Sequence, residues 1–304
     1  MEKKLRKSNQ ENEKMVREFI SKICNNSEEL IATYNFRNQN NQLQIIDGLK
    51  GFKEYKIGYR RGNKFDCDNC DLIMQIWCCL LVKIKEAHNV SYTGRIITYE
   101  TKDGACYKIE TDTMNSLETS FNDFVREVIK SKYGITWGEL YTKGKGVKNS
   151  IIIDNGWENT KCCEINRDEW LLKYWDEVFE GLSEDEKERY DDYETLANLV
   201  HSIGNFVLGP VGFNCKSPNA KANFGDRMDL FFKGISSKQQ QCEECQEWVQ
   251  WFRSNKGILV LDDYCIDSNK DMFIQGNFVD LGNIKMVNEL ILQRGKAIAK
   301  LLLD

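Results

Sequence analysis

Proline is almost missing from this chain, since its 304 residues include only Pro210 and Pro218. A proline inside a helix removes one backbone hydrogen bond, and its ring clashes with the preceding turn, so it usually ends or kinks the helix. Helices can therefore run without interruption over most of the sequence. On this ground we predict a helix-rich fold.

Apolar residues recur at helical spacing in many segments, so each segment has one face to bury. These amphipathic segments are 15–23, 117–129, 170–179, 196–203, 245–252 and 287–302, and a further short helix is expected at 27–36. The segment 71–86 differs because it is apolar on nearly all sides. A helix of this kind is buried in the core of a protein. We expect 71–86 to be the central helix.

Near residues 92–109 the pattern changes to β-branched and aromatic residues. Ile96–Tyr99 and Cys106–Ile109 are separated by the polar turn Lys102-Asp103-Gly104. Two such runs around a glycine-containing turn predict a β-hairpin. The sequence therefore predicts an α+β fold that is predominantly helical, with a small hairpin.

No repeat, proline-rich linker or low-complexity segment divides the chain. We predict one helix-rich domain over residues 1–304, a length that a single domain can reach. The glycine- and lysine-rich stretch 143–155 is the one place where the sequence suggests an internal boundary.

The composition is that of a folded globular protein, with 41% hydrophobic and 29% charged residues. The charged start 1–7 is followed by a polar run, where a signal peptide would have an apolar segment. The most apolar window, 72–84, is shorter than the roughly 20 residues of a membrane span. The twelve cysteines are dispersed, unlike those of small secreted scaffolds. We expect a soluble, cytoplasmic protein with reduced thiols and no membrane contact.

Two Cys-x-x-Cys pairs, Cys67 with Cys70 and Cys242 with Cys245, have the internal spacing of zinc ligands. The pairs lie much further apart in sequence than those of compact zinc ribbons. Cys245 also shares an apolar helical stripe with Trp248, where a cysteine usually serves as a small core residue. We expect neither zinc nor another cofactor.

The segment 112–118 begins with the motif Asp-Thr-Met-Asn-Ser and precedes a predicted helix. Asn115 as N-cap and Glu118 three residues later form a capping-box pattern, which satisfies backbone donors at a helix start. We favour this structural role over catalysis.

His201 is one of only two histidines and begins the motif His-Ser-Ile-Gly-Asn-Phe at 201–206. A lone histidine at a helix end is usually a hydrogen-bonded structural residue, and Gly204 suits the left-handed position that ends a helix. We therefore predict that His201 and Asn205 tie the end of the helix to the following turn. A catalytic role for His201, Asn205 and Asn214 is the alternative.

The motifs at 112–116 and 201–206, followed by Phe213-Asn214, resemble those of a bacterial and phage family to which no activity is assigned. The stretch from His201 to Asn214 also resembles the later half of the His-Asn-His endonuclease region of modification-dependent restriction enzymes. The segment Glu289–Gly295 is similar to the helix that follows this region.

The resemblance implies a particular division of roles. In such endonucleases an upstream Glu-His-Ile segment supplies the general base, and the later residues orient this base and hold a metal. This chain has no histidine between Asn149 and Val200, and His88 lies far upstream. The resemblance therefore implies a degenerate or repurposed module that lacks the upstream catalytic histidine.

The segment 50–64 interleaves cations with aromatic residues and contains a single acid, Glu54. Surfaces that bind nucleic acid combine backbone charge and base stacking in this way, although a solvated basic loop has the same composition. The candidate contacts are Lys53, Lys56, Arg60, Arg61, Phe52, Tyr55 and Tyr59. The stretch 176–194 is strongly acidic, so charge is unevenly distributed along the chain.

These features predict a non-catalytic binding protein, with nucleic acid or a protein as partner, in a phage-defence or phage-related setting. The alternative is a metal-dependent nuclease with a degenerate site at His201, Asn205 and Asn214. An enzyme would place these residues with acidic side chains in an open cleft, whereas a structural motif would bury them.

Overall fold

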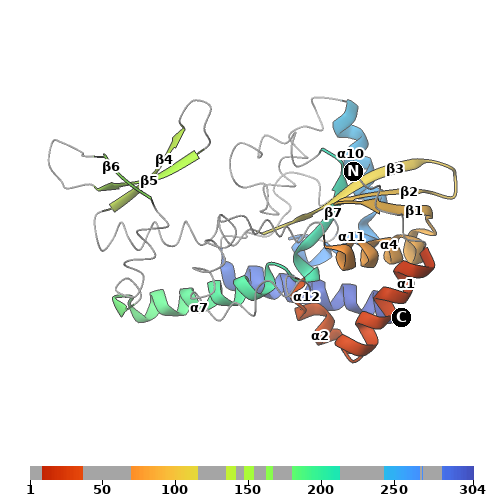
Figure 1. The fold of residues 1–304 in the computed structure, drawn as a ribbon, viewed down its shortest axis with the longest axis horizontal. Coiled ribbons are helices and arrows are strands. Elements are labelled where there is room, and N and C mark those ends of the chain that lie inside the picture. Colours follow the sequence, from red (N-terminus) through yellow and green to blue (C-terminus); the bar gives the residue numbers. More distant parts are fainter. Residues whose placement is uncertain are drawn as a thin grey trace.

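The computed structural model describes residues 9–36, 70–115, 135–141, 147–153, 162–166, 180–212, 243–267, 269 and 283–304 (Figure 1). Within these residues the fold is α+β and mostly helical, as predicted, with seven α-helices and a four-stranded antiparallel sheet. The helices are α1 (Asn9–Glu18), α2 (Glu28–Thr33), α4 (Asp71–Lys85), α7 (Glu184–Leu199), α10 (Glu243–Ser254), α11 (Lys256–Leu259) and α12 (Ile284–Leu303). A π-helical turn, η1 (Phe19–Ile23), and two 3₁₀ turns, η4 (Ile203–Asn205) and η6 (Asp262–Tyr264), complete the helical elements of this part.

The main sheet contains β1 (His88–Thr93), β2 (Ile96–Glu100), β3 (Cys106–Thr113) and β7 (Phe206–Pro210), in the order β1-β2-β3-β7. The predicted hairpin is β2 and β3, and Gly104 takes a φ of +84° in its turn. The sheet is larger than predicted, because β1 precedes the hairpin and β7 joins β3 from far along the chain. Pro210 ends β7 at the sheet edge, where a missing backbone donor is tolerated.

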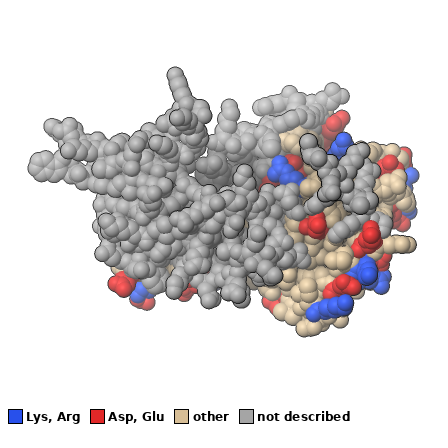
Figure 2. Space-filling model, viewed as in Figure 1, with Lys and Arg blue, Asp and Glu red and all other residues tan. Residues whose placement is uncertain are grey.

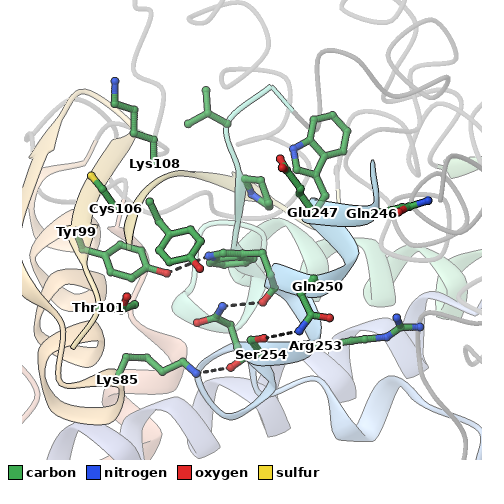
Figure 3. A pocket seen from close by; sticks show the side chains of 16 residues that line it. Lys85, Tyr99, Thr101, Cys106, Lys108, Gln246, Glu247, Gln250, Arg253 and Ser254 are labelled. Carbon is green, nitrogen blue, oxygen red and sulfur yellow. Dashed lines mark hydrogen bonds between the residues drawn. The ribbon is translucent and has the colours of Figure 1, made fainter. Parts of the chain in front are cut away.

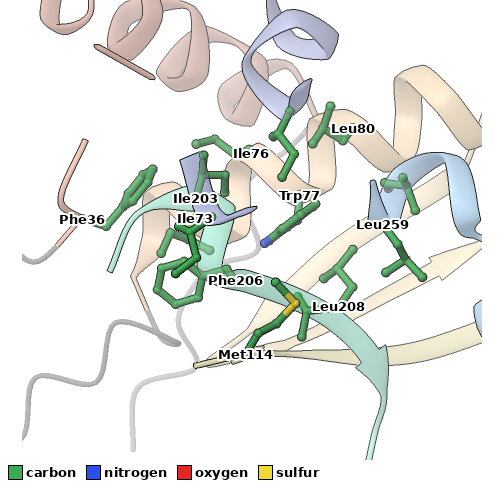
Figure 4. Close-up of a cluster of buried hydrophobic side chains, with 14 of the residues drawn as sticks. Phe36, Ile73, Ile76, Trp77, Leu80, Met114, Ile203, Phe206, Leu208 and Leu259 are labelled. Carbon is green, nitrogen blue, oxygen red and sulfur yellow. The ribbon is translucent and has the colours of Figure 1, made fainter. Parts of the chain in front are cut away.

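Helix α4 is the central core helix, as its apolar sequence predicts. Ile73, Ile76 and Trp77 are completely buried. The Oγ1 atom of Thr111 in β3 donates to the sulfur of Met74 over 3.7 Å, which joins the sheet to α4. Figure 4 shows side chains of α4, η4 and β7 gathered in one apolar cluster. Each fully buried large apolar side chain contributes about 1.5–3 kcal/mol to the free energy of folding.

Helix α12 packs against α2, α7 and η4. Gly295 permits the close contact with α2, because a Cβ atom at this position would lie 3.1 Å from the Cβ of Ala32. In the structure α7 begins with a capping box in which Ser183 and Glu186 each accept a hydrogen bond from the other's backbone N–H. The first turn of α7 contains acidic residues, whose negative charges interact favourably with the positive end of the helix dipole.

A second sheet consists of β4 (Ile135–Tyr141), β5 (Val147–Ile153) and β6 (Cys162–Asn166), all antiparallel. Strand β5 occupies part of the stretch 143–155, so much of this stretch is a strand and not a loop. The predicted helices at 117–129 and 170–179 lie outside the described residues. Among the described helices, none combines the length and apolarity that crossing a membrane requires.

Candidate functional site

The two motifs at 112–116 and 201–206 meet in the fold. Strands β3 and β7 pair so that Thr113 lies opposite Phe206. One residue further on, the N–H of Met114 donates to the carbonyl oxygen of Asn205 over 2.8 Å. We call residues 114–115 together with 201–206 the motif junction.

The side-chain amide of Asn205 holds the motif junction together. Its Oδ1 atom accepts hydrogen bonds from the backbone N–H and from the Nδ2 atom of Asn115, both at 3.0 Å. Its Nδ2 atom donates to the carbonyl oxygens of Asn115 at 2.9 Å and Val200 at 2.8 Å. The two donors and two acceptor positions of the amide are thus all used, and the side chain is completely buried. Asn205 therefore connects the end of α7 to the end of β3.

His201 lies in the turn between α7 and η4, with 9% of its surface exposed. Its carbonyl oxygen accepts the N–H of Phe36 over 3.1 Å. The Phe36 ring in turn meets the Phe206 ring edge to face, with centroids 6.4 Å apart. His201 is therefore buried where three segments meet, and it does not line the large cleft described below.

Arg294 of α12 binds the motif junction through its guanidinium. Its guanidinium is buried, and Nη1 donates to the carbonyl oxygens of Gly204 at 2.7 Å and Phe206 at 2.6 Å. Nε donates to the carbonyl oxygen of Leu259 at 2.8 Å. Burial lowers the pKa of Arg294 to about 10, which still leaves the group charged near neutral pH. Arg294 belongs to the segment 289–295, which is similar to a helix of the endonucleases. This part of the segment therefore lies in the core.

The role predicted for Gly204 is wrong. Helix α7 ends at Leu199, before this glycine, and Gly204 lies within the 3₁₀ turn η4 and is not among the glycines with positive φ. The structure requires glycine here for packing, because a Cβ atom would lie 1.9 Å from the carbonyl oxygen of Ile291 in α12. Such a contact cannot be seen in the local sequence.

Other predicted site residues are only partly described. Asn214, Cys67, Cys242 and the segment 50–64 lie outside the described residues. Cys70 is buried at the start of α4, and burial raises the pKa of its thiol. In the part of the chain that the structure describes, no three His, Cys, Asp or Glu side chains gather to hold a metal. The capping box with Glu118, the expected lack of zinc and the nuclease alternative stay predictions.

A cleft of about 1260 Å³ lies at another place, between the β2–β3 hairpin and α10. Figure 3 shows the side chains of Tyr99, Cys106 and Lys108 on the side of the hairpin, with Glu247, Gln250 and other α10 residues across from them. Pro210 and Val211, at the end of β7, contribute to the lining. We call this space the aromatic cleft.

An aromatic pair forms one wall of the aromatic cleft. Tyr99 and Tyr107 lie opposite each other on β2 and β3, and their rings stack with centroids 5.5 Å apart and an interplanar angle of 26°. The Tyr99 hydroxyl accepts the Nε1–H of Trp251 over 3.0 Å, and burial raises the pKa of this hydroxyl to about 12. Tyr99 is 1% exposed, whereas Tyr107 is 37% exposed. The inner ring is therefore fixed, and the outer ring is accessible.

No match was found when the chain was compared with family models, curated proteins and solved structures.

Positive charge exceeds negative charge in the aromatic cleft. Lys85, Lys108 and Arg253 line it, and Glu247 is the one acid among the lining residues within the described ranges. The Lys85 ammonium donates to the carbonyl oxygen of Ser254, which ties the end of α4 to the end of α10. Burial lowers the pKa of Lys85. Lys108 is exposed on β3, next to Tyr107. The cleft can therefore attract an anion that also carries a flat ring.

The aromatic cleft was not predicted from the sequence. The signal present in the sequence is weak, because Tyr107-Lys108 is a single aromatic–cation pair within a predicted strand. Its partners on α10 lie more than a hundred residues away in sequence, as the separation between Tyr99 and Trp251 shows. Only the packing of α10 against the hairpin brings them together.

Proposed function

We propose that this protein binds single-stranded nucleic acid and that the aromatic cleft is a stacking site for its bases. The observation that carries this proposal is the exposed Tyr107 ring, stacked on the buried ring of Tyr99 in a cleft that Lys108 also lines. Every base has a flat π-face, so an exposed aromatic ring beside cations binds single strands with little sequence preference.

The geometry favours stacking because the Tyr107 ring is already oriented before a base binds. Trp251 fixes the hydroxyl of Tyr99, and Tyr99 supports one face of Tyr107. A ring that is already oriented loses little conformational entropy when a base stacks on it. A base against the Tyr107 ring would extend a stack that the protein has already begun.

The charges of the cleft suit a phosphate backbone near the bases. Lys108 lines the cleft on the side of the hairpin, with its side chain directed away from the stacked rings, and Arg253 lies on the α10 side. On the face seen in Figure 2, the basic and acidic side chains of the described residues are interspersed, without a broad basic area. We therefore expect few phosphate contacts in the cleft and moderate affinity with a shallow salt dependence. The basic segment 50–64 is the second contact region that the sequence predicts.

Binding is a better reading of the cleft than cleavage. Among the lining residues that the structure describes, Glu247 is the one carboxylate and none is a histidine. Acid–base or metal-assisted hydrolysis needs at least two such groups in a common geometry.

The test is fluorescence anisotropy with end-labelled single strands of about 15 nucleotides, a length at the upper end of common site sizes. Tyr107→Leu removes the exposed ring, and since stacking contributes about 1–3 kcal/mol per base, we expect binding to weaken about 5- to 150-fold. Tyr107→Phe keeps the ring and should bind like the native protein. Lys108→Ser should weaken binding and reduce the slope of log K against log salt.

The matched control for the cation is Lys102→Ser. Lys102 lies in the turn of the same hairpin, pairs with Glu86 and is not among the residues that line the cleft. This variant should bind normally. Absence of binding by the native protein at low salt would overturn the proposal, as would equal affinities of the Tyr107→Leu and Tyr107→Phe variants.

A further inference from the structure

Glu247 is an exception among the charged side chains of the aromatic cleft. Its carboxylate is exposed on α10, whereas the other charged lining residues within the described ranges are the cations Lys85, Lys108 and Arg253. A negative charge at this place weakens the attraction of the cleft for phosphate groups. The carboxylate therefore suits a contact with the bases of a nucleic acid, which carry no charge.

Glu247 lies on the side of α10 that contacts the tyrosine pair. Trp251, which donates to the Tyr99 hydroxyl over 3.0 Å, follows one helical turn after Glu247. Side chains four residues apart lie on the same face of a helix, with their Cβ atoms about 5–6 Å apart. Figure 3 shows Glu247 on the α10 side of the cleft and Tyr99 on the hairpin side. A base that stacks on Tyr107 would therefore turn one edge toward α10 and its carboxylate.

We propose that Glu247 makes the aromatic cleft prefer guanine over the other bases. This preference rests on the proposed function, since it requires that a base stacks on Tyr107. A carboxylate offers two acceptor oxygens side by side and no donor. The Watson–Crick edge of guanine carries two adjacent donors, N1–H and the N2 amino group, so both oxygens accept a hydrogen bond from this base.

The other bases lack this pair of donors. Adenine, cytosine and thymine each place an acceptor beside a donor on the same edge, so one carboxylate oxygen would face an acceptor. Stacking on Tyr107 does not by itself discriminate between bases. The amides of Gln246, Gln250 and Asn255 offer both a donor and an acceptor, and Glu247 is the one described lining residue whose side chain offers acceptors only. Glu247 is therefore the residue that separates guanine from the other bases.

The test is fluorescence anisotropy of the full chain with four labelled single strands of about 15 nucleotides. Each strand is thymine in which every third base is replaced by guanine, adenine, cytosine or hypoxanthine. Hypoxanthine keeps the stacking surface and the N1–H of guanine and lacks only the N2 amino group. A good bidentate contact corresponds to about 5- to 150-fold in affinity, so the guanine strand should bind at least about 5-fold more tightly than the other three.

Glu247→Gln keeps the shape of the side chain and replaces one acceptor oxygen by a donor. In this variant the guanine strand should bind no more tightly than the hypoxanthine strand, and both should still bind. Asp263→Asn is the matched control, because Asp263 is also exposed and is not among the residues that line the cleft. This control removes the same charge and should retain the preference for guanine.

Failure of the guanine preference and failure of nucleic-acid binding give different results. If the four strands bind with equal affinity, the preference is refuted and stacking on Tyr107 stands. If the Glu247→Gln variant retains the preference, the role of Glu247 is refuted. If no strand binds at low salt, nucleic-acid binding is refuted and the preference with it. The comparison of guanine with hypoxanthine needs no variant, so it can refute the preference even if the Glu247→Gln variant does not fold.

Discussion

Replacement of Asn205 by aspartate tests the motif junction most directly, because it changes one donor group and almost no volume. The Oδ1 atom keeps its two hydrogen bonds from Asn115, at 3.0 Å. The Nδ2 atom, which donates to the carbonyls of Asn115 at 2.9 Å and Val200 at 2.8 Å, becomes an oxygen. Two attractive contacts are thereby replaced by two contacts between acceptors.

The magnitude follows from the two carbonyl groups that lose their donor. Each buried polar group left unpaired costs about 1–3 kcal/mol, so we expect the Asn205→Asp variant to lose about 4 kcal/mol of unfolding free energy at neutral pH. That is a large part of the total stability of about 5–15 kcal/mol that folded domains have. Wild type should therefore unfold at a clearly higher temperature than the variant.

The loss should depend on pH. Burial and the two facing carbonyl oxygens disfavour the charged form, so the pKa of the introduced carboxyl is raised in the folded state above its unfolded value of about 3.9. A protonated carboxyl can donate to one carbonyl. The stability gained by protonation is therefore fully present below the unfolded pKa and is lost as the pH rises through the folded pKa. The difference from wild type should be smaller at pH 5 than at pH 8.

The assay is urea unfolding followed by circular dichroism at both pH values. Asn198→Asp is the matched control, because Asn198 is exposed on α7 and makes one hydrogen bond, from Nδ2 to the carbonyl of Glu194 at 3.2 Å. Its effect should stay within about 0.5 kcal/mol, as for most surface substitutions. A similarly small effect of Asn205→Asp at pH 8, or a loss that does not change with pH, would refute the structural role assigned to Asn205.

Three further predictions concern other parts of the chain. Gly204→Ala should lower the melting temperature strongly, because the added Cβ atom would lie 1.9 Å from the carbonyl oxygen of Ile291. Gly257→Ala should not, because Gly257 has open space around it, and equal melting temperatures of the two variants would contradict the packing role of Gly204. Elemental analysis of the purified protein should find no stoichiometric zinc, and about one zinc per chain would show that the cysteine pairs form a site. Replacing Lys53, Lys56, Arg60 and Arg61 by serine should weaken binding to single strands and reduce its salt dependence, because these cations are the predicted second contact region; unchanged binding would assign the affinity to the aromatic cleft alone.

The sequence by itself determined the elements whose signal is local. Apolar spacing at every three or four residues located α12, and a run that is apolar on nearly all sides located α4. Gly104 and its polar neighbours located the turn between β2 and β3, because a positive φ there is easily reached only by glycine. The α+β class followed from these elements.

Tertiary structure alone decided how these elements meet and what they form. Strand β7 is five residues long, and its pairing partner in β3 lies about 90 residues away, so no local pattern reveals the pair. Arg294 resembles a surface cation of an amphipathic helix in the sequence, yet its guanidinium is buried against three carbonyl oxygens. The hydrogen bond from Trp251 that fixes the Tyr99 hydroxyl likewise depends on a distant segment. Periodicity shows which face of an element is buried, but the partner of that face is selected by packing over the whole chain.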